Sequence, residues 1–214
     1  MTPLPWIALA CAVGYLALTA RPAGVLRSVV KTTAVAALAV AAVLAQAPVM
    51  LAVALALCAL GDLLLSRDGD AAFMGGIAAF AAGHLAYIAL FLLHPLADIG
   101  RIGDVPQVWV AAGLVLLGVV MARLLAPRAG SLRGPVLGYI PIILGMGVAV
   151  LALPETGPGP GWALVAAFAF VASDMVLASE KFLLTEGHPA LRWTPYVVWP
   201  LYWGAQAGFF AVFA

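Results

Sequence analysis

Apolar runs of about 17–23 residues recur along this chain of 214 residues, and they constrain its fold more than any other feature. A helix rises about 1.5 Å per residue, so each run can cross most or all of the roughly 30 Å of bilayer hydrocarbon. Hydrophobic residues make up 65% of the sequence and charged residues only 9%. Soluble domains have roughly 45–50% and 25%. The chain is therefore expected to lie within a membrane.

The runs predict an all-α fold, a polytopic membrane bundle of eight transmembrane helices in a single domain covering residues 1–214. Eight spans of about 20 residues use roughly 160 positions, so the connections are short and no extramembrane domain is expected. The first run is expected to remain as a span, because no positive charge precedes it as in a signal peptide. The spans are expected at 4–20, 28–46, 48–66, 71–93, 106–126, 135–153, 161–180 and 195–213.

The positive charges indicate an orientation. Nine of the ten Lys and Arg residues lie in or beside odd-numbered connections, and only Arg101 lies in an even-numbered one. Because cytoplasmic loops are rich in Lys and Arg, the odd connections are predicted to be cytoplasmic and both termini to be on the opposite side. Arg is commoner than Lys and Ala is abundant, as in proteins of GC-rich bacteria. We therefore expect the bacterial plasma (inner) membrane, with the active site toward the cytoplasm.

Several classes of protein are excluded or disfavoured. The net charge of +1 and the absence of a basic tract exclude a nucleic-acid-binding protein. Cys11 and Cys58 lie far apart within apolar runs, which indicates packing residues rather than a disulfide or a Cys-x-x-Cys metal site. No His-Glu-x-x-His motif is present, so no metal and no cofactor are expected. No obligate protein partner is indicated.

Three ionisable residues lie inside predicted spans at similar depth on the predicted cytoplasmic side. They are Lys31 in the second span, Asp62 in the third and Asp174 in the seventh. An ionisable group near the bilayer centre costs about 2.5–3.5 kcal/mol on insertion scales, so such residues usually face the bundle interior and serve a function. The alternative is that Lys31 extends to the surface while Asp62 pairs locally with Arg67. Asp174 has mostly apolar neighbours, which favours an interior role.

Further polar side chains share helical faces with aromatic ones. His84 and Tyr87 lie one turn apart in the fourth span, and a histidine in this position is most often a hydrogen-bonded core residue. The eighth span has aromatic residues that also suit an interfacial belt, but its glutamine lies too deep for that role. A polar cavity between the spans explains the whole set. Its expected residues are Lys31, Asp62, His84, Tyr87, Tyr139, Ser173, Asp174, Tyr196, Tyr202 and Gln206.

Two carboxyl groups in a poorly solvated cavity are suited to acid–base hydrolysis. One can remain protonated and act as a general acid, while the other remains charged and orients water. The same carboxylates would equally suit a proton-coupled transporter or a lipid flippase. Ser173 is a weak candidate nucleophile, because it points away from the adjacent Asp174 on a helix and no Gly-x-Ser-x-Gly motif is present. A purely structural bundle would not explain the buried acids.

Four motifs occur in order from the third to the eighth span, and through them the sequence resembles the YhhN family of membrane proteins. The animal members of this family are lysoplasmalogenases. In one departure, Lys31 is followed by Thr32 where the family is expected to have proline. The motifs are Gly61-Asp62-x-x-Leu65, Phe73-x-Gly75 to Phe80-x-x-x-His84-x-x-Tyr87, Ser173-Asp174-x-x-Leu177-Ala178 with Phe182, and Tyr202-x-x-Ala205-Gln206.

The resemblance implies eight spans, a cavity open toward the cytoplasm, and hydrolysis of the vinyl ether bond of a lysophospholipid. The products would be a fatty aldehyde and glycerophosphoethanolamine or glycerophosphocholine. It also implies that Asp62 and Asp174 are catalytic. This agrees with the chemistry, because enol ether hydrolysis needs an acid that protonates carbon and a carboxylate that stabilises the cation and activates water. The remaining polar residues of the cavity would bind the phosphate and the glycerol hydroxyl.

Overall fold

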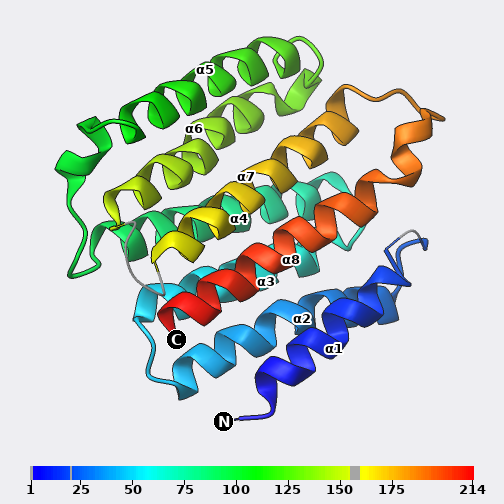
Figure 1. Ribbon diagram of the computed structural model, residues 1–214. Coiled ribbons are helices and arrows are strands. Elements are labelled where there is room, and N and C mark those ends of the chain that lie inside the picture. The colour runs from blue at the N-terminus through cyan, green and yellow to red at the C-terminus, as the bar shows by residue number, and fades with distance from the viewer. Residues whose placement is uncertain (1, 20, 155–159) are drawn as a thin grey trace.

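The computed structural model describes residues 2–19, 21–154 and 160–214, which form eight α-helices, four short 3-10 helices and no strand (Figure 1). The all-α prediction is therefore confirmed. The α-helices are α1 (Leu4–Leu16), α2 (Val25–Leu44), α3 (Val49–Leu65), α4 (Asp70–Leu92), α5 (Gln107–Leu125), α6 (Arg133–Ala149), α7 (Pro160–Phe182) and α8 (Thr194–Phe213). The 3-10 helices are η1 (Ile99–Gly103), η2 (Gly130–Leu132), η3 (Val150–Ala152) and η4 (Pro189–Arg192).

Each predicted span corresponds to one helix, and most ends agree within three residues. Two ends differ by four residues: α6 ends at Ala149, where the 3-10 helix η3 continues to Ala152, and α1 ends at Leu16, where a turn follows, while residue 20 lies outside the described residues. Most of the connection predicted at 154–160 also lies outside them. Gly69 has a φ of 103° between α3 and α4, a conformation that favours glycine and allows the chain to reverse direction there.

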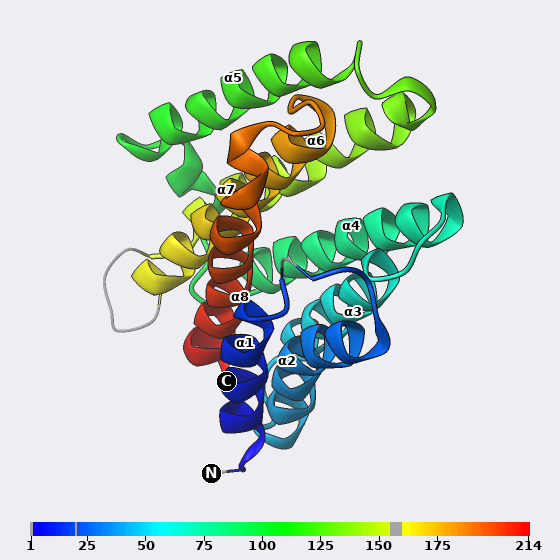
Figure 2. The same ribbon diagram turned by 90° about the vertical axis from the view of Figure 1, so that its right-hand side faces the viewer.

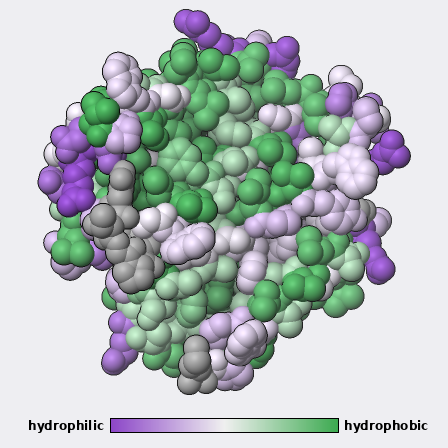
Figure 3. Space-filling view, viewed as in Figure 1, coloured by the Kyte–Doolittle hydropathy of each residue, from purple (hydrophilic) through white to green (hydrophobic). Residues whose placement is uncertain are grey.

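Five helical segments are long and apolar enough to cross a membrane: Val25–Leu44, Asp70–Leu92, Gln107–Leu125, Gly130–Ala152 and Gly161–Phe182. The helices α1 and α3 are apolar but shorter, with 13 and 17 residues. Large apolar side chains are exposed along the outside of the bundle, among them Val13, Val115 and Leu116. Figure 3 shows apolar residues across the middle of one face and hydrophilic residues around its edge. The chain is an integral membrane protein.

Most helices pack on the next helix in the chain, but α4 packs on α6 rather than on α5, and α8 crosses back to the N-terminal half (Figures 1 and 2). Helices α1 to α4 pack in order, α7 packs along α8, and α6 contacts α4, α5 and α7. Two indole N–H groups of α8 donate to backbone carbonyls: Trp199 to Ala12 at 2.9 Å and Trp203 to Ala34 at 3.0 Å. These bonds join α8 to α1 and α2. Helix α5 lies at the edge of the bundle and packs mainly on α6.

Glycines allow α3 and α4 to approach closely. A Cβ atom at Gly61 would lie 2.6 Å from ring carbons of Phe80, and one at Gly83 would lie 2.8 Å from the Cys58 sulfur. Small residues are common where helices pack within membranes, because close packing contributes much of the attraction there. This approach matters for function, because Asp62 follows Gly61 on α3 and His84 follows Gly83 on α4.

We predict that Gly61→Ala destabilises the protein. The added methyl group collides with the Phe80 ring, which is itself packed against Tyr202 at 5.6 Å between ring centroids. Overpacking of this kind costs about 1–3 kcal/mol, which outweighs the helix-propensity gain of roughly 1 kcal/mol. Thermal unfolding of the purified protein in detergent should show a lower midpoint. The control is Gly14→Ala in α1, where a Cβ meets no atom within 4 Å and the midpoint should not fall. Equal midpoints for the two variants would contradict the prediction.

Candidate functional site

The first polar cluster joins α2, α3 and α8. Lys31 Nζ lies 2.9 Å from Asp62 Oδ1, and the Tyr202 hydroxyl donates to Asp62 Oδ2 at 2.7 Å. Each carboxylate oxygen therefore has its own positively polarised partner. The Asp62 side chain is 1% exposed and that of Lys31 is 19% exposed, so the cation lies on the more open side of the pair. Lys31 is thus an interior residue paired with Asp62, rather than one that extends to the surface without a partner.

The second cluster joins α4, α6 and α7 around Asp174. The Tyr139 hydroxyl donates to Asp174 Oδ2 at 2.5 Å, and His84 Nε2 lies 3.7 Å from the same oxygen. His84 Nδ1 lies 2.6 Å from the Phe80 carbonyl oxygen. Because a carbonyl oxygen only accepts, Nδ1 carries a proton, and in the neutral ring Nε2 then presents a lone pair. The His84 side chain is fully buried, and its Nε2 has no hydrogen-bond partner among the described residues.

Aromatic rings connect the two clusters. The Phe170 ring lies 4.5 Å from the His84 ring and 5.2 Å from the Tyr202 ring, measured between centroids. The two carboxyl groups therefore belong to one region of the bundle, bounded by apolar and aromatic walls. Charges in such a region are screened less by water than they are at the surface.

A third polar pair lies beside the first cluster. The Tyr87 hydroxyl donates to Gln206 Oε1, and both side chains are buried. Their surroundings are aromatic, with the Tyr87 ring 4.4 Å from that of Phe209. A buried amide needs partners for its oxygen and its nitrogen, and the tyrosine satisfies the oxygen. This pair sets the relative position of α4 and α8 behind the carboxylates.

Two of the residues expected in the cavity lie elsewhere. Ser173 donates to the Val198 carbonyl at 3.2 Å, so its hydroxyl joins α7 to α8 and does not contact the carboxyl of Asp174. Tyr196 is 43% exposed in the first turn of α8, as suits an aromatic residue at the membrane interface. The other predicted residues belong to the two clusters or to the Tyr87–Gln206 pair: Lys31, Asp62, His84, Tyr87, Tyr139, Asp174, Tyr202 and Gln206.

Sequence reasoning missed two contributors to this region. Phe170 precedes Asp174 by four residues on α7, and this spacing could have indicated a shared helical face. The Phe80 carbonyl, which orients His84, lies four residues before it within α4. A backbone group leaves no signal in residue identity, so nothing in the sequence could have revealed its role.

The arrangement suits transfer of a proton more than binding of a metal. Among the described residues, no group of three or more His, Cys, Asp or Glu side chains is placed to hold a metal ion. The region has one carboxylate neutralised by an ammonium group and a second carboxyl bordered by a phenol and an imidazole. Paired carboxyl groups with different environments are typical of acid–base chemistry.

The comparisons with known proteins assign the family. No curated protein and no solved structure matches the chain. The sequence model of the YhhN family matches residues 26–213, which include every residue of both clusters and of the Tyr87–Gln206 pair. The match leaves out residues 1–25, which include all of α1 and the first residue of α2, and residue 214. The chain therefore belongs to the YhhN family.

Proposed function

We propose that this protein is a lysoplasmalogenase-like ether hydrolase, which cleaves the vinyl ether bond of alkenyl lysophospholipids. The observation that carries the proposal is the pair of carboxyl groups, Asp62 and Asp174, each bonded to a tyrosine hydroxyl inside the bundle. In the reaction, an acid protonates the second carbon of the vinyl group and leaves an oxocarbenium ion. Water adds to this ion, and the hemiacetal breaks down to a fatty aldehyde and the glycerophospho-alcohol.

The two carboxyl groups have different partners, which supports different roles. The Lys31 ammonium at 2.9 Å from Asp62 favours the charged carboxylate, so Asp62 stabilises the cation and orients water. Asp174 faces the lone pair of neutral His84, which would repel a carboxylate but tolerates a carboxylic acid. Tyr139 occupies Asp174 Oδ2, which leaves Oδ1 to carry the transferable proton. Asp174 is therefore the general acid in this proposal.

Lys31 also suits the polar end of the substrate. Its ammonium group contacts Asp62, and its side chain is 19% exposed, so part of it remains open to a ligand. Lys31 lies in the second turn of α2, near the end of that helix predicted to be cytoplasmic. A phosphate placed there would be attracted by the cation without displacing the carboxylate. In this arrangement the lysophospholipid enters from the cytoplasmic half of a bacterial inner membrane crossed by eight spans, and the aldehyde returns to the lipid.

We predict that Asp62→Asn and Asp174→Asn each reduce turnover by about 10²–10⁴-fold, the usual contribution of a general acid or base. The change removes the acid–base function and keeps the size of the side chain. The measurement is aldehyde release from alkenyl-lysophosphatidylethanolamine by purified, monodisperse protein in detergent. Asp68→Asn, at an exposed position between α3 and α4, is the matched control and should retain full activity.

An active double variant carrying both Asp→Asn changes would overturn the assignment of the catalytic pair. If wild-type protein that is folded and monodisperse releases no aldehyde, the hydrolase proposal fails. Proton-coupled transport in liposomes, through the same carboxylates, then becomes the leading function, and both Asp→Asn variants should abolish that transport.

We predict opposite sidedness for consecutive connections. In a Cys11→Ala/Cys58→Ala background, Asp104→Cys in the fourth connection should react with a membrane-impermeant maleimide on intact cells. Ser131→Cys in the fifth connection should react only after the membrane is permeabilised. Both positions are exposed, so burial does not explain a difference. Labelling of both on intact cells, or the reverse pattern, would contradict eight spans with the termini outside.

A further inference from the structure

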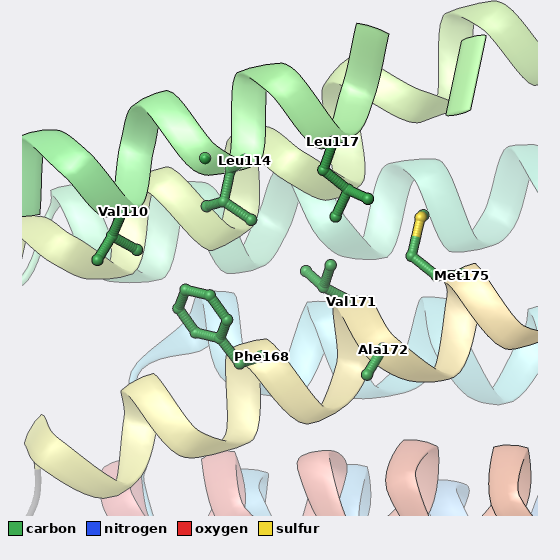
Figure 4. Close-up of a pocket in the computed structure, with 8 residues that line it drawn as sticks. Val110, Leu114, Leu117, Phe168, Val171, Ala172 and Met175 are labelled. Atoms are coloured by element: carbon green, nitrogen blue, oxygen red, sulfur yellow. The ribbon is translucent and has the colours of Figure 1, made fainter. Parts of the chain in front are cut away.

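We propose that a cleft between α5 and α7 binds the hydrocarbon chain of the substrate and that this cleft opens laterally to the bilayer. The proposal rests on the hydrolase function proposed above and adds the site for the apolar part of the lipid. The cleft has a volume of about 360 Å³. Figure 4 shows its two walls, which are lined by Val110, Gly113, Leu114 and Leu117 of α5 and by Phe168, Val171, Ala172 and Met175 of α7.

The cleft exists because α5 and α7 do not pack against each other along this stretch. Helix α5 packs mainly on α6 and η1, while α7 packs along α8 and touches α6. Two of the lining residues are small, Gly113 on α5 and Ala172 on α7. A Cβ atom at Gly113 would meet no atom within 4 Å, so the α5 wall is open at this point. The cleft results from the way α5 and α7 are packed on other helices, and a narrow ligand can enter it from the side.

The α7 wall of the cleft includes close sequence neighbours of Asp174. Val171 and Met175 line the cleft, and they lie three residues before and one residue after Asp174 on α7. The Asp174 side chain is 11% exposed, whereas that of Asp62 is 1% exposed. Asp174 is thus the more accessible carboxyl, as expected of the acid that must reach a carbon atom. From Phe168 to Met175 the α7 wall extends about 10 Å along the helix.

The lining identifies the occupant as a hydrocarbon chain. All eight residues that line the cleft are apolar. A phosphate or an ammonium headgroup would therefore lose its hydration there without gaining a hydrogen-bond partner. A vinyl ether lies where the chain joins the glycerol oxygen. With the chain in the cleft, that bond falls beside Asp174 and the phosphate is directed toward the cytoplasmic ends of the helices, where Lys31 lies.

A larger groove of about 640 Å³ lies on the other side of α5, between α4, α5, α6 and η1. It is also apolar, and Leu114 lines both spaces. Its lining includes no residue of α7, the helix that carries Asp174, whereas the smaller cleft is lined by Val171 and Met175, close to Asp174 in the sequence. A chain held there would place its polar end away from both carboxyl groups, so the smaller cleft is the better site for a reacting lipid.

The first test uses a saturated, non-hydrolysable alkyl-lysophospholipid with a photoreactive diazirine midway along its chain. After irradiation of the purified protein, peptide mass spectrometry should locate the label on 110–117 and 168–175. Gly113→Trp and, from the opposite wall, Ala172→Trp should each reduce this labelling. Gly14→Trp is the matched control, because Gly14 is also exposed within a helix and its Cβ would meet no atom within 4 Å. Monodispersity in detergent confirms that each variant is folded.

The second test compares substrates. Gly113→Trp should raise KM for a long-chain alkenyl substrate about tenfold, as expected when roughly two methylene groups lose their site, and leave KM for a short-chain substrate unchanged. Labelling confined to the α4–α5–α6 groove, or an unchanged long-chain KM in both Trp variants, overturns the proposal while the hydrolase function stands. Conversely, labelled cleft peptides in a protein that releases no aldehyde support the cleft and refute the reaction.

Discussion

The ion pair between Lys31 and Asp62 is the interaction on which the rest of the site depends. It joins α2 to α3 inside an apolar bundle, and the Tyr202 hydroxyl extends it to α8. A buried charge without a partner is strongly unfavourable, and removal of one member of such a pair typically costs about 3–5 kcal/mol. The three helices can therefore pack stably only in the arrangement that brings these side chains together. The indole bonds from Trp199 to α1 and from Trp203 to α2 hold the same arrangement from positions on α8 within one turn of Tyr202.

The second carboxyl group, that of Asp174, differs from that of Asp62 because its partners do not include an ammonium group. Asp174 has a phenol and an imidazole nearby, whereas Asp62 has an ammonium group at 2.9 Å. The imidazole is oriented by the Phe80 carbonyl within the same helix, so α4 presents a lone pair toward α7. This asymmetry between two chemically identical side chains supports the division into a general acid and a charged partner. It also agrees with the apolar cleft, whose α7 wall includes Met175, the sequence neighbour of Asp174.

Much of this could be predicted from residue types. Long apolar runs located all eight helices because a bilayer requires segments of a certain length, and the ends of α2 to α8 followed from Gly, Pro and charged residues. Asp62, Asp174 and Lys31 stood out because ionisable groups are rare within apolar runs. The first span was overestimated at its C-terminal end, because hydropathy does not distinguish a helix from the apolar turn that follows Leu16. Tyr196 was expected in the cavity, but it lies in the first turn of α8, six residues and so about 120° around the helix from Tyr202, and its side chain is exposed.

The sequence by itself determined that the chain is a helical membrane protein and which few side chains cannot face lipid. The reason is that hydrophobicity and backbone hydrogen bonding are properties of each segment alone. Only the tertiary structure decided which of those side chains meet: Lys31 with Asp62, Tyr139 with Asp174, and Tyr87 with Gln206. It also decided that α5 stands apart from α7 and leaves a cleft whose α7 wall includes Val171 and Met175. These outcomes depend on how helices distant in sequence pack, which is set by shape, by small residues such as Gly61 and Gly83, and by the need to pair every buried polar group.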